Sequence, residues 1–586
     1  MRRVLVVMMG LIAGLPFVPG RARAERFARH VVVSQEANAS DAGREVLGRG
    51  GNAVDAAVAT AFALAVTHPA AGNLGGGGFI VAYLADRREV ITIDFREAAP
   101  RRADVRMYLG PDGTLLPHYR AGARAAGVPG TVRGLGLAHE RYGKAAWADL
   151  VRPAARLARG GFRISEELAT SLNAQLQDRR RPPDEVARRD DLGSGTDRLA
   201  DFPESVAALG KPDASPWQPG DLLVQRDLAD TLDRIAEHGP DEFYAGETAR
   251  IVARYMAERG GLITLDDLAA YRPKERPPVH TSFRGSEVYG MGPPSSGGIV
   301  ICQMLNILER YDLKADGPRS PRTLHRVTEA MRRAFLTRAT EVADPDFVAV
   351  PVATLTSKAH ADALARSIDD RATPSARLAK FPVQDAEPGA HTTHLSTIDA
   401  EGTAVALTYT LEEGYGSKAV VAGAGFLLNN EMGDFNLIPG RTDASGRIGT
   451  PANQIAPGKR MLSSMSPTVV LEGGRVRLVT GSPGGRTIPN TTLWVVLNVL
   501  EFGLDPTEAV AAPRTHHPWF PDVLTLEGGS WPDSTVAALQ AMGHSVRRGS
   551  LQGDAHTIVV GPPTAPEAPR HGIADRRRGT SKVSGD

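Results

Sequence analysis

The side-chain pattern of this 586-residue chain changes abruptly near residue 391, and this change restricts the folds that the chain can adopt. Before it, strand-like and helix-like stretches alternate, whereas after it apolar residues recur with the period of two that is typical of strands. The expected helices lie at 41–49, 53–67, 225–237, 247–259 and 320–339, and the expected strands at 31–33, 80–84, 393–398, 403–410, 468–471 and 476–480. The pattern predicts a compact α/β protein.

Three segments have the composition of loops. Residues 178–195 are rich in Arg, Asp and Pro and predict a solvated surface excursion. Residues 369–390 are rich in Pro, Ala and Asp without periodicity, which predicts a flexible linker just before the change in pattern. The tail from residue 562 onward is rich in Pro and Arg, and we expect it to be partly disordered at its end.

The N-terminus has the three parts of a secretory signal peptide. Two arginines follow Met1, residues 4–18 are mostly apolar, and residues 22–24 form a small-x-small cleavage site. A membrane anchor is the alternative, but the apolar run is shorter than the roughly 20 residues that a spanning helix needs. We therefore expect residues 1–24 to be removed and the mature, secreted chain to start at Glu25, most simply in a periplasm.

Charge and cysteine content exclude several classes of protein. The leader carries four arginines and no acidic residue, which leaves 64 basic against 67 acidic residues in the mature chain. This balance argues against a nucleic-acid or membrane-surface protein. Cys302 is the only cysteine, so no intramolecular disulfide can form and a large packed core must provide stability.

Residues 72–79 contain a four-glycine run that leads into an expected strand. A phosphate-binding loop is one interpretation, but no Gly-Lys-Ser/Thr follows and the spacing is not that of a dinucleotide fingerprint. Close backbone packing, which glycine permits, is the interpretation that we prefer.

Thr392 stands where the expected linker meets the first expected strand of the second part. If the peptide bond before it were cut, its Oγ would lie beside a free α-amine of pKa about 8, a base suited to neutral pH. A Thr-Thr pair at a strand start is also common as a structural feature. A metal pair of His391 and His394 is disfavoured because no third ligand with metal spacing accompanies it. From these residues alone, the nucleophilic and the structural interpretation both stay open.

The segment Thr392-Thr393-His394-Leu395-Ser396 resembles the processing-site motif of the γ-glutamyltranspeptidases, members of the N-terminal nucleophile hydrolase superfamily. The resemblance covers nearly the whole mature chain. Further matching stretches lie at 50–57, 67–69 with the glycine run after it, 94–97, 293–298, 428–432, 462–467 and 480–485.

The resemblance implies roles for four catalytic residues. Thr392 would be both the self-cleaving residue, at the bond after His391, and the nucleophile, with Thr410 as its hydrogen-bond partner. Gly484 and Gly485 match the oxyanion-hole pair, although the same segment could simply be a turn after a strand. Losing one such backbone donor typically costs about 3 kcal/mol of transition-state stabilisation.

The resemblance also implies how the zwitterionic glutamyl end of a donor is held. Its α-carboxylate would bind Arg96, whose guanidinium can form a bidentate fork, together with two serine hydroxyls. Its α-ammonium would bind two acids. The serines are Ser463 and Ser464, and the acids are Glu431 and Asp434.

Two positions depart from the family pattern. Glu412 stands where well-known members have Asn, so it is a further candidate for contact with the ammonium. Residues 439–449, which match a lid over the site in bacterial relatives, contain no aromatic residue where some relatives have Tyr. The balance between hydrolysis and transfer therefore cannot be carried over from the family.

The resemblance implies a four-layer αββα sandwich built jointly by a large subunit, 25–391, and a small subunit, 392–586. It implies ping-pong cleavage of γ-glutamyl amides such as glutathione, with transfer to water, amino acids or peptides, and with no metal or organic cofactor.

Three rival functions fit the sequence less well. A glutaryl- or cephalosporin-type acylase is disfavoured because Asp434 is retained, and an inert binding protein because Thr392 and both glycines are retained. A serine hydrolase is disfavoured because no Gly-x-Ser-x-Gly elbow is present.

Overall fold

Two seven-stranded sheets form the centre of the computed structural model, which describes residues 23–176, 197–378, 391–442, 449–529, 531–562, 568–575, 577 and 579–586. In spatial order the first sheet contains β1 (Arg23–Phe27), β18 (Arg570–Ala574), β17 (His556–Val560), β13 (Arg475–Thr480), β12 (Thr468–Glu472), β9 (Ser286–Gly290) and β8 (Val279–Phe283). The second contains β19 (Lys582–Gly585), β2 (Val31–Ser34), β10 (His391–Ile398), β11 (Ala404–Glu412), β3 (Gly77–Leu84), β4 (Glu89–Phe95) and β7 (Lys274–Arg276).

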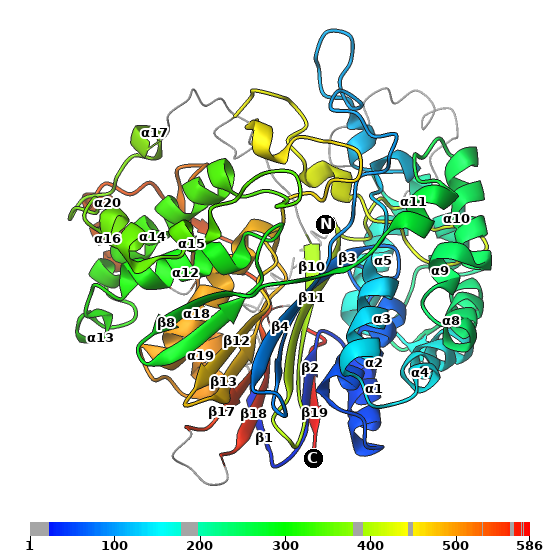
Figure 1. Cartoon of the computed structure of the whole chain (residues 1–586), viewed down its shortest axis with the longest axis horizontal. Helices are drawn as coiled ribbons and strands as arrows, with labels where there is room; N and C mark the ends of the chain where they lie inside the picture. The colour runs from blue at the N-terminus through cyan, green and yellow to red at the C-terminus, as the bar shows by residue number, and fades with distance from the viewer. Residues whose placement is uncertain are drawn as a thin grey trace, which may run out of the picture.

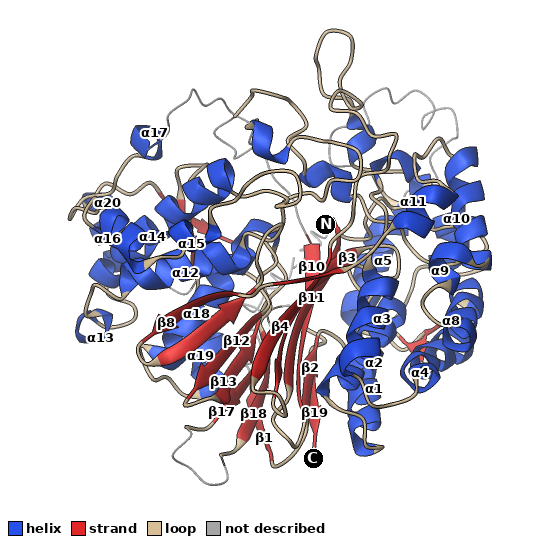
Figure 2. Ribbon diagram, in the orientation of Figure 1, coloured by secondary structure: helices blue, strands red, loops and turns tan. Residues whose placement is uncertain are grey.

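Helices cover the outer face of each sheet, so that the molecule has four layers (Figures 1 and 2). The second sheet is flanked by α1 (Ala37–Gly48), α2 (Ala53–Thr67), α3 (Thr131–Tyr142), α4 (Trp147–Gly160), α5 (Glu166–Leu176), α7 (Pro203–Leu209), α8 (Arg226–His238), α9 (Glu242–Ala245), α10 (Glu247–Glu258) and α11 (Leu265–Ala270). The first sheet is flanked by α12 (Gly297–Leu308), α13 (Leu313–Asp316), α14 (Pro321–Glu341), α15 (Val352–Leu355), α16 (Lys358–Ala365), α17 (Ser375–Leu378), α18 (Ile488–Leu500), α19 (Pro506–Ala511) and α20 (Asp533–Ala541).

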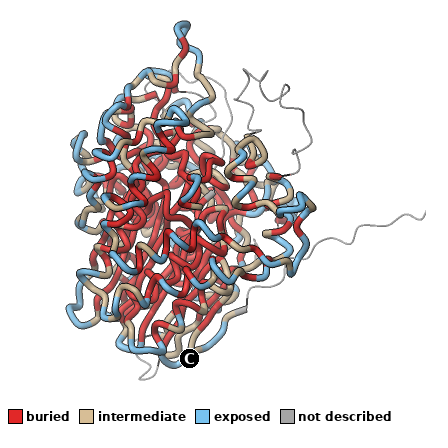
Figure 3. Tube along the Cα trace, turned by 90° about the vertical axis from the view of Figure 1, so that its right-hand side faces the viewer, coloured by how far each residue is buried: buried red, intermediate tan, exposed pale blue. Residues whose placement is uncertain are grey.

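Three apolar cores hold these layers together. One lies between the sheets and includes Val33, Phe79, Val469 and Val479, which are fully buried. The other two lie between each sheet and its helices, and Figure 3 shows the buried trace filling the interior. Since burial of apolar surface is the main driving force of folding, this arrangement explains how the chain folds without a disulfide. The four-layer αββα sandwich predicted for the chain is confirmed.

Short pairs of strands complete the fold. β14 (Thr515–His516), β15 (Leu524–Glu527) and β16 (Val546–Gly549) form a small three-stranded sheet, and β5 (Phe162–Arg163) pairs with β6 (Leu222–Leu223). In the described part of the chain, no helix is long and apolar enough to cross a membrane.

The helix α2 shows how local sequence sets an element. Asn52 caps it by accepting bonds from the backbone N–H groups of Val54 and Asp55, and the Asp55 carboxylate accepts the N–H of Asn52 in return. This reciprocal capping box satisfies donors that a helix start leaves unpaired. Every residue of α2 is buried, because the helix lies between the second sheet and the outer helices. The helix expected at 53–67 is confirmed.

The prediction that the C-terminal tail is partly disordered at its end is wrong. The tail supplies β18 to the interior of the first sheet and β19 to the edge of the second. Its Pro- and Arg-rich composition gave no indication of this, because both strands depend on partners near the opposite end of the chain, β1 and β2.

The prediction that residues 369–390 form a flexible linker is wrong for residues 369–378. Ser375, at the start of α17, is fully buried, and its backbone N–H donates to Asp522 at 2.7 Å while its hydroxyl accepts from Arg332 at 2.7 Å. The rest of this linker, the surface excursion at 178–195, residues 443–448 of the expected lid and residues 1–22 of the leader lie outside the described residues. Arg23 and Ala24 begin β1.

Candidate active site

One cavity of about 550 Å³ is lined by every residue to which the sequence assigned a catalytic or substrate-binding role. These residues come from the position directly after β4, from β11, from the start of β10, and from loops that follow β11 and β13. They are Arg96, Thr392, Thr410, Glu412, Glu431, Asp434, Ser463, Ser464, Gly484 and Gly485. The fold thus brings together residues that are almost 400 positions apart.

Thr392 is the second residue of β10 and lies opposite a β-bulge. His391 pairs with Glu412 and Thr393 pairs with Tyr409, so two residues of β11 face the single residue Thr392. Bulges interrupt the ladder and re-aim side chains, and they are common next to active sites. Here the bulge places both Thr392 and Thr410 on the cavity wall, with Thr392 only 5% exposed.

Glu412, at the end of the bulge, has an unusual backbone conformation. Its φ is +81°, in the left-handed region that favours glycine, and its N–H donates to Thr410 Oγ1 at 2.8 Å. The hydroxyl of Thr410 is therefore held by the backbone on the side of Glu412.

Gly484 and Gly485 follow β13 and adopt φ values of +134° and +56°. A Cβ on Gly484 would lie 2.4 Å from Thr487 Oγ1, so both its conformation and its surroundings require glycine. Ser482 lies two residues before Gly484, and its hydroxyl accepts a hydrogen bond from the N–H of Asp554 at 2.8 Å. The glycine pair is thus tied to the segment 552–555.

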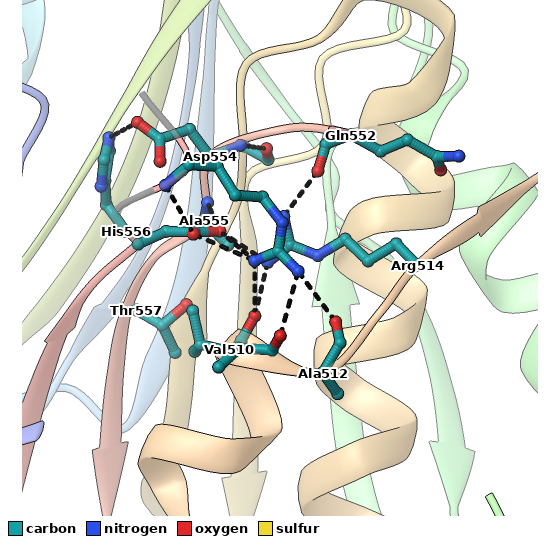
Figure 4. A network of polar contacts seen from close by, with 12 residues as sticks. Val510, Ala512, Arg514, Gln552, Asp554, Ala555, His556 and Thr557 are labelled. Atoms are coloured by element: carbon teal, nitrogen blue, oxygen red, sulfur yellow. Dashed lines mark hydrogen bonds and ion pairs between the residues drawn. The ribbon is translucent and has the colours of Figure 1, made fainter. Parts of the chain in front are cut away.

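A buried polar network fixes that segment (Figure 4). Arg514 donates to the carbonyls of Gln552 and Val510, and it pairs with Asp575 at 2.7 Å. Asp575 in turn accepts the N–H of Ala555 at 2.9 Å. Arg514 and Asp575 are almost fully buried, and a buried network with satisfied partners rigidifies its surroundings. The network therefore fixes the backbone of the segment that Ser482 contacts.

Arg96 is the centre of an ion-pair cluster at the other part of the cavity. Its Nη1 lies 2.6 Å from Glu431 Oε2 and 3.4 Å from Glu97 Oε2, and its Nη2 pairs with Asp434. Arg96, Glu97 and Glu431 are almost fully buried, whereas the Asp434 side chain is 37% exposed. Arg96 was assigned to the carboxylate of the substrate, and Glu431 and Asp434 to its ammonium. In this structure they form ion pairs with each other instead.

Burial, together with the neighbouring acids, raises the pKa values of three glutamates around this part of the cavity. Burial, only partly offset by Arg96, raises the pKa of Glu97 to about 7. Burial and the neighbouring acids Glu413 and Asp434 raise the pKa of Glu412 well above its usual value. Burial also raises the pKa of Glu431, with Glu412 among the charges that add to the effect. Glu412 therefore belongs electrostatically to the acidic cluster around Arg96.

Ser463 and Ser464 lie on a segment that packs against the start of α12. The Ser463 carbonyl accepts both the N–H and the hydroxyl of Ser296, at 2.9 and 2.7 Å, and the Ser463 N–H donates to Pro294. Two stretches that matched the family pattern separately, 293–298 and 462–467, thus meet at the cavity.

Several charged residues near the site had no role assigned from the sequence, among them Glu97, Arg338 and Arg486. Glu97 lies within a recognised stretch but next to the more conspicuous Arg96. Arg338 on α14 and Arg486 after the glycine pair both line the cavity. Arg338 lay in a predicted helix without any local signal, and only the three-dimensional fold reveals its position.

One group among the described residues has metal-ligand spacing, namely His325, Glu329 and His544. None of the three lines the cavity. The Glu329 carboxylate already pairs with Arg333 at 2.6 Å and with Arg332 at 3.2 Å. A divalent cation there would meet two guanidinium groups, so the donor set does not fit a metal ion. His394 is also engaged, with Thr408 Oγ1 2.8 Å from its Nδ1.

A four-layer αββα sandwich with a strand that presents a threonine to a cavity beside a glycine pair is the architecture of the N-terminal nucleophile hydrolases. A family model described as gamma-glutamyltranspeptidase matches residues 39–584. The chain belongs to the γ-glutamyltranspeptidase family.

Individual proteins resemble the chain over most of its length. It is 43% identical to a glutathione hydrolase proenzyme of Escherichia coli strain K12, over 93% of this chain and 90% of that protein. It is 37% identical to an acylase ACY 1 proenzyme of Pseudomonas sp. strain SE83, over 91% and 90%. A crystal structure of cephalosporin acylase from Bacillus halodurans covers 99% of both chains with a TM-score of 0.81 at 25% identity.

Proposed function

We propose that the chain is the precursor of an enzyme that cuts its own backbone between His391 and Thr392 and then cleaves γ-glutamyl amides such as glutathione. The observation that carries the proposal is the single cavity that combines Thr392, the Gly484–Gly485 pair and the Arg96 cluster. Membership of the family and similarity to glutathione hydrolase proenzymes support it.

Processing starts from the intact chain. Thr392 Oγ attacks the carbonyl carbon of His391, the C–N bond breaks, and the nitrogen of Thr392 takes up a proton as the acyl group moves to oxygen. Water then hydrolyses this ester and releases the carboxylate of His391. The bulge opposite Thr392 supports this step, because it removes Thr392 from the regular ladder and leaves its hydroxyl at the cavity.

The new α-amine of Thr392 serves as the base for the second reaction. It accepts the proton of Oγ as Oγ attacks the γ-carbonyl of a donor, and the leaving amine departs with a proton. The backbone N–H groups of Gly484 and Gly485 stabilise the oxyanion that forms. Water, an amino acid or a peptide amine then resolves the γ-glutamyl ester.

The Arg96 cluster favours a zwitterionic donor. The α-carboxylate of a glutamyl group replaces the acids as the partner of Arg96. Its α-ammonium replaces Arg96 as the partner of Glu431 and Asp434, so that every charge keeps an opposite charge beside it. Ser463 and Ser464 lie beside the carboxylate, and Glu412 adds a third acid near the ammonium. A glutaryl donor lacks the ammonium and would leave buried acids without a counter-charge, which is costly.

Acylase activity is the second candidate, because relatives of this chain include proteins named as acylases. A matched pair of anilides separates the two. We expect the purified mature protein to cleave γ-glutamyl-4-nitroanilide and to be at least tenfold less active on glutaryl-4-nitroanilide. Equal or greater activity on the glutaryl compound would instead establish an acylase, and no activity on either would overturn both.

We also propose that residues 1–24 are a signal peptide, that the protein is exported, most simply to a periplasm, and that residues 25–391 and 392–586 stay associated after cleavage. Both sheets combine strands from the two segments, which supports the association. In the second sheet β2 lies between β19 and β10, and β11 pairs with β3.

A further inference from the structure

The cavity has a second charged wall that the glutamyl group does not use. In the small three-stranded sheet, His516 of β14 pairs with Thr525 of β15, and Thr525 pairs with Arg547 of β16. Laterally paired residues share one face of a sheet, and all three line the cavity. Their exposure increases from the buried His516 to the exposed Arg547, so the row leads from the interior to the rim.

Two more guanidinium groups border this row. Arg486 directly follows the glycine pair and donates to the carbonyl of Phe520 at 3.4 Å. Arg338 lies three residues after Phe335, whose ring packs edge-on against His516 at 5.8 Å. Burial and the proximity of Arg486 lower the pKa of Arg338 to about 10. Cations are therefore concentrated on this wall, in contrast to the acids around Arg96.

The row can recognise an anion. Arg547 Nη2 donates to Thr525 Oγ1 at 3.3 Å, and in the described part of the chain it has no carboxylate partner. A guanidinium next to a hydroxyl offers several donors to one carboxylate. Leu551, a neighbouring wall residue, is 38% exposed and gives the rim an apolar contact.

We propose that Arg547, with Thr525 and Arg486, forms a subsite for the carboxylate of the leaving group or acceptor, and so selects donors and acceptors that end in a free carboxylate. This inference rests on the proposed function, because it assigns the part of the cavity beyond the γ-amide. It gives the cavity two poles: a zwitterion site around Arg96 and a cationic site for the C-terminal end of a peptide.

Two chromogenic donors test the subsite directly. γ-Glutamyl-3-carboxy-4-nitroanilide and γ-glutamyl-4-nitroanilide differ only by a carboxylate on the leaving group. We expect wild type to prefer the carboxylated donor in kcat/KM, and Arg547→Gln to reduce that preference about tenfold, the scale of one charge-assisted hydrogen bond. Arg547→Lys should keep part of the preference, because it keeps the charge.

Arg548→Gln is the matched control. Arg548 is the next residue on β16, pairs with Asp533 at 2.5 Å and does not line the cavity, so its loss changes the net charge equally. A lowered preference in Arg547→Gln but not in Arg548→Gln would support the subsite. Equal rates on the two donors in wild type, or the same loss on both donors in Arg547→Gln, would overturn it while leaving γ-glutamyl activity established. Failure of wild type on both donors would instead overturn the proposed function.

Discussion

At the scale of single residues, the proposed recognition of a donor depends on the ion pairs of Arg96. Asp434 is the most exposed of its acidic partners and is therefore the one that a substrate ammonium reaches first. We expect Asp434→Asn to weaken γ-glutamyl donors by about 2 kcal/mol, the lower end of the range for a broken charge pair, because the Asp434 side chain is 37% exposed. Glutaryl donors should lose much less, because they have no ammonium. Comparison of kcat/KM for the two anilides checks this, and equal losses would refute the assignment.

The negative charge of Glu412 destabilises the folded protein, and the size of this effect depends on pH. Its pKa is raised above the usual 4.5, so between pH 4.5 and the raised value the folded state holds a proton that the unfolded state has lost. Stability therefore falls as the pH rises through this window. We expect Glu412→Gln to be more stable than wild type at pH 8 by about 0.5–2 kcal/mol and to show no gain at pH 4.

Urea unfolding at the two pH values measures this difference. Glu258→Gln is the control, because Glu258 is exposed at the end of α10 and does not line the cavity, so its loss should not stabilise the protein at either pH. A Glu412→Gln variant that is equally stable at pH 8, or less stable than wild type, would show that Glu412 is not strained by its neighbours.

Replacing Glu412 also tests its place near the ammonium. Because a protonated acid no longer attracts the ammonium, donor binding weakens as the cluster takes up protons. Asn is the usual family residue at this position, so we expect Glu412→Asn to stay active, with the acid limb of its kcat/KM profile moved to lower pH. An unmoved limb would place the carboxylate away from the substrate, and complete inactivation would show that Asn is not an acceptable replacement.

At the scale of elements, what the sequence predicted depends on how local the signals are. The helix α2 and the strands β12 and β13 were predicted correctly, because their signals are local: a capping residue and apolar residues for α2, and apolar periodicity on both sides of Gly473-Gly474 for the two strands. The C-terminal strands and the order of residues 369–378 were missed, because their partners lie far away in the chain. The site residues were recognised through motifs, whereas Arg338 and Arg547 carried no local signal.

The C-terminal strands make a prediction at the same scale. β18 lies inside the first sheet between β1 and β17, whereas β19 is an edge strand that also carries the Lys582–Asp41 ion pair. A chain that ends at residue 569 should therefore fail to fold and accumulate as aggregates, because it exposes the edge of β17. A chain that ends at residue 580 should be soluble but less stable. Soluble yield and thermal unfolding distinguish them, and a stable protein ending at 569 would contradict this account.

At the scale of the whole molecule, buried histidines make the fold sensitive to acid. Burial and nearby positive charge lower the pKa of His517 to about 4 and of His544 to about 3. The unfolded chain therefore binds protons near pH 6.5 that the folded protein excludes, and stability falls as the pH drops from about 6.5 towards 4. Each group contributes on the order of a few kcal/mol to this loss.

Thermal unfolding across this range tests the effect. We expect His544→Gln to flatten the decline, whereas replacement of the exposed His238 by Gln should leave it unchanged. A wild-type protein with the same unfolding temperature at pH 7 and pH 4.5 would contradict the argument.

Self-cleavage before Thr392 is the central claim, and intact-mass measurement of the purified protein tests it most directly. Wild type should give two chains, the smaller beginning at Thr392, while Thr392→Ala should give one folded, inactive chain. Thr393→Ala, which alters a buried neighbour that does not line the cavity, should still be cut. A wild-type protein that is fully active as a single chain, or that breaks at another bond, would contradict the account.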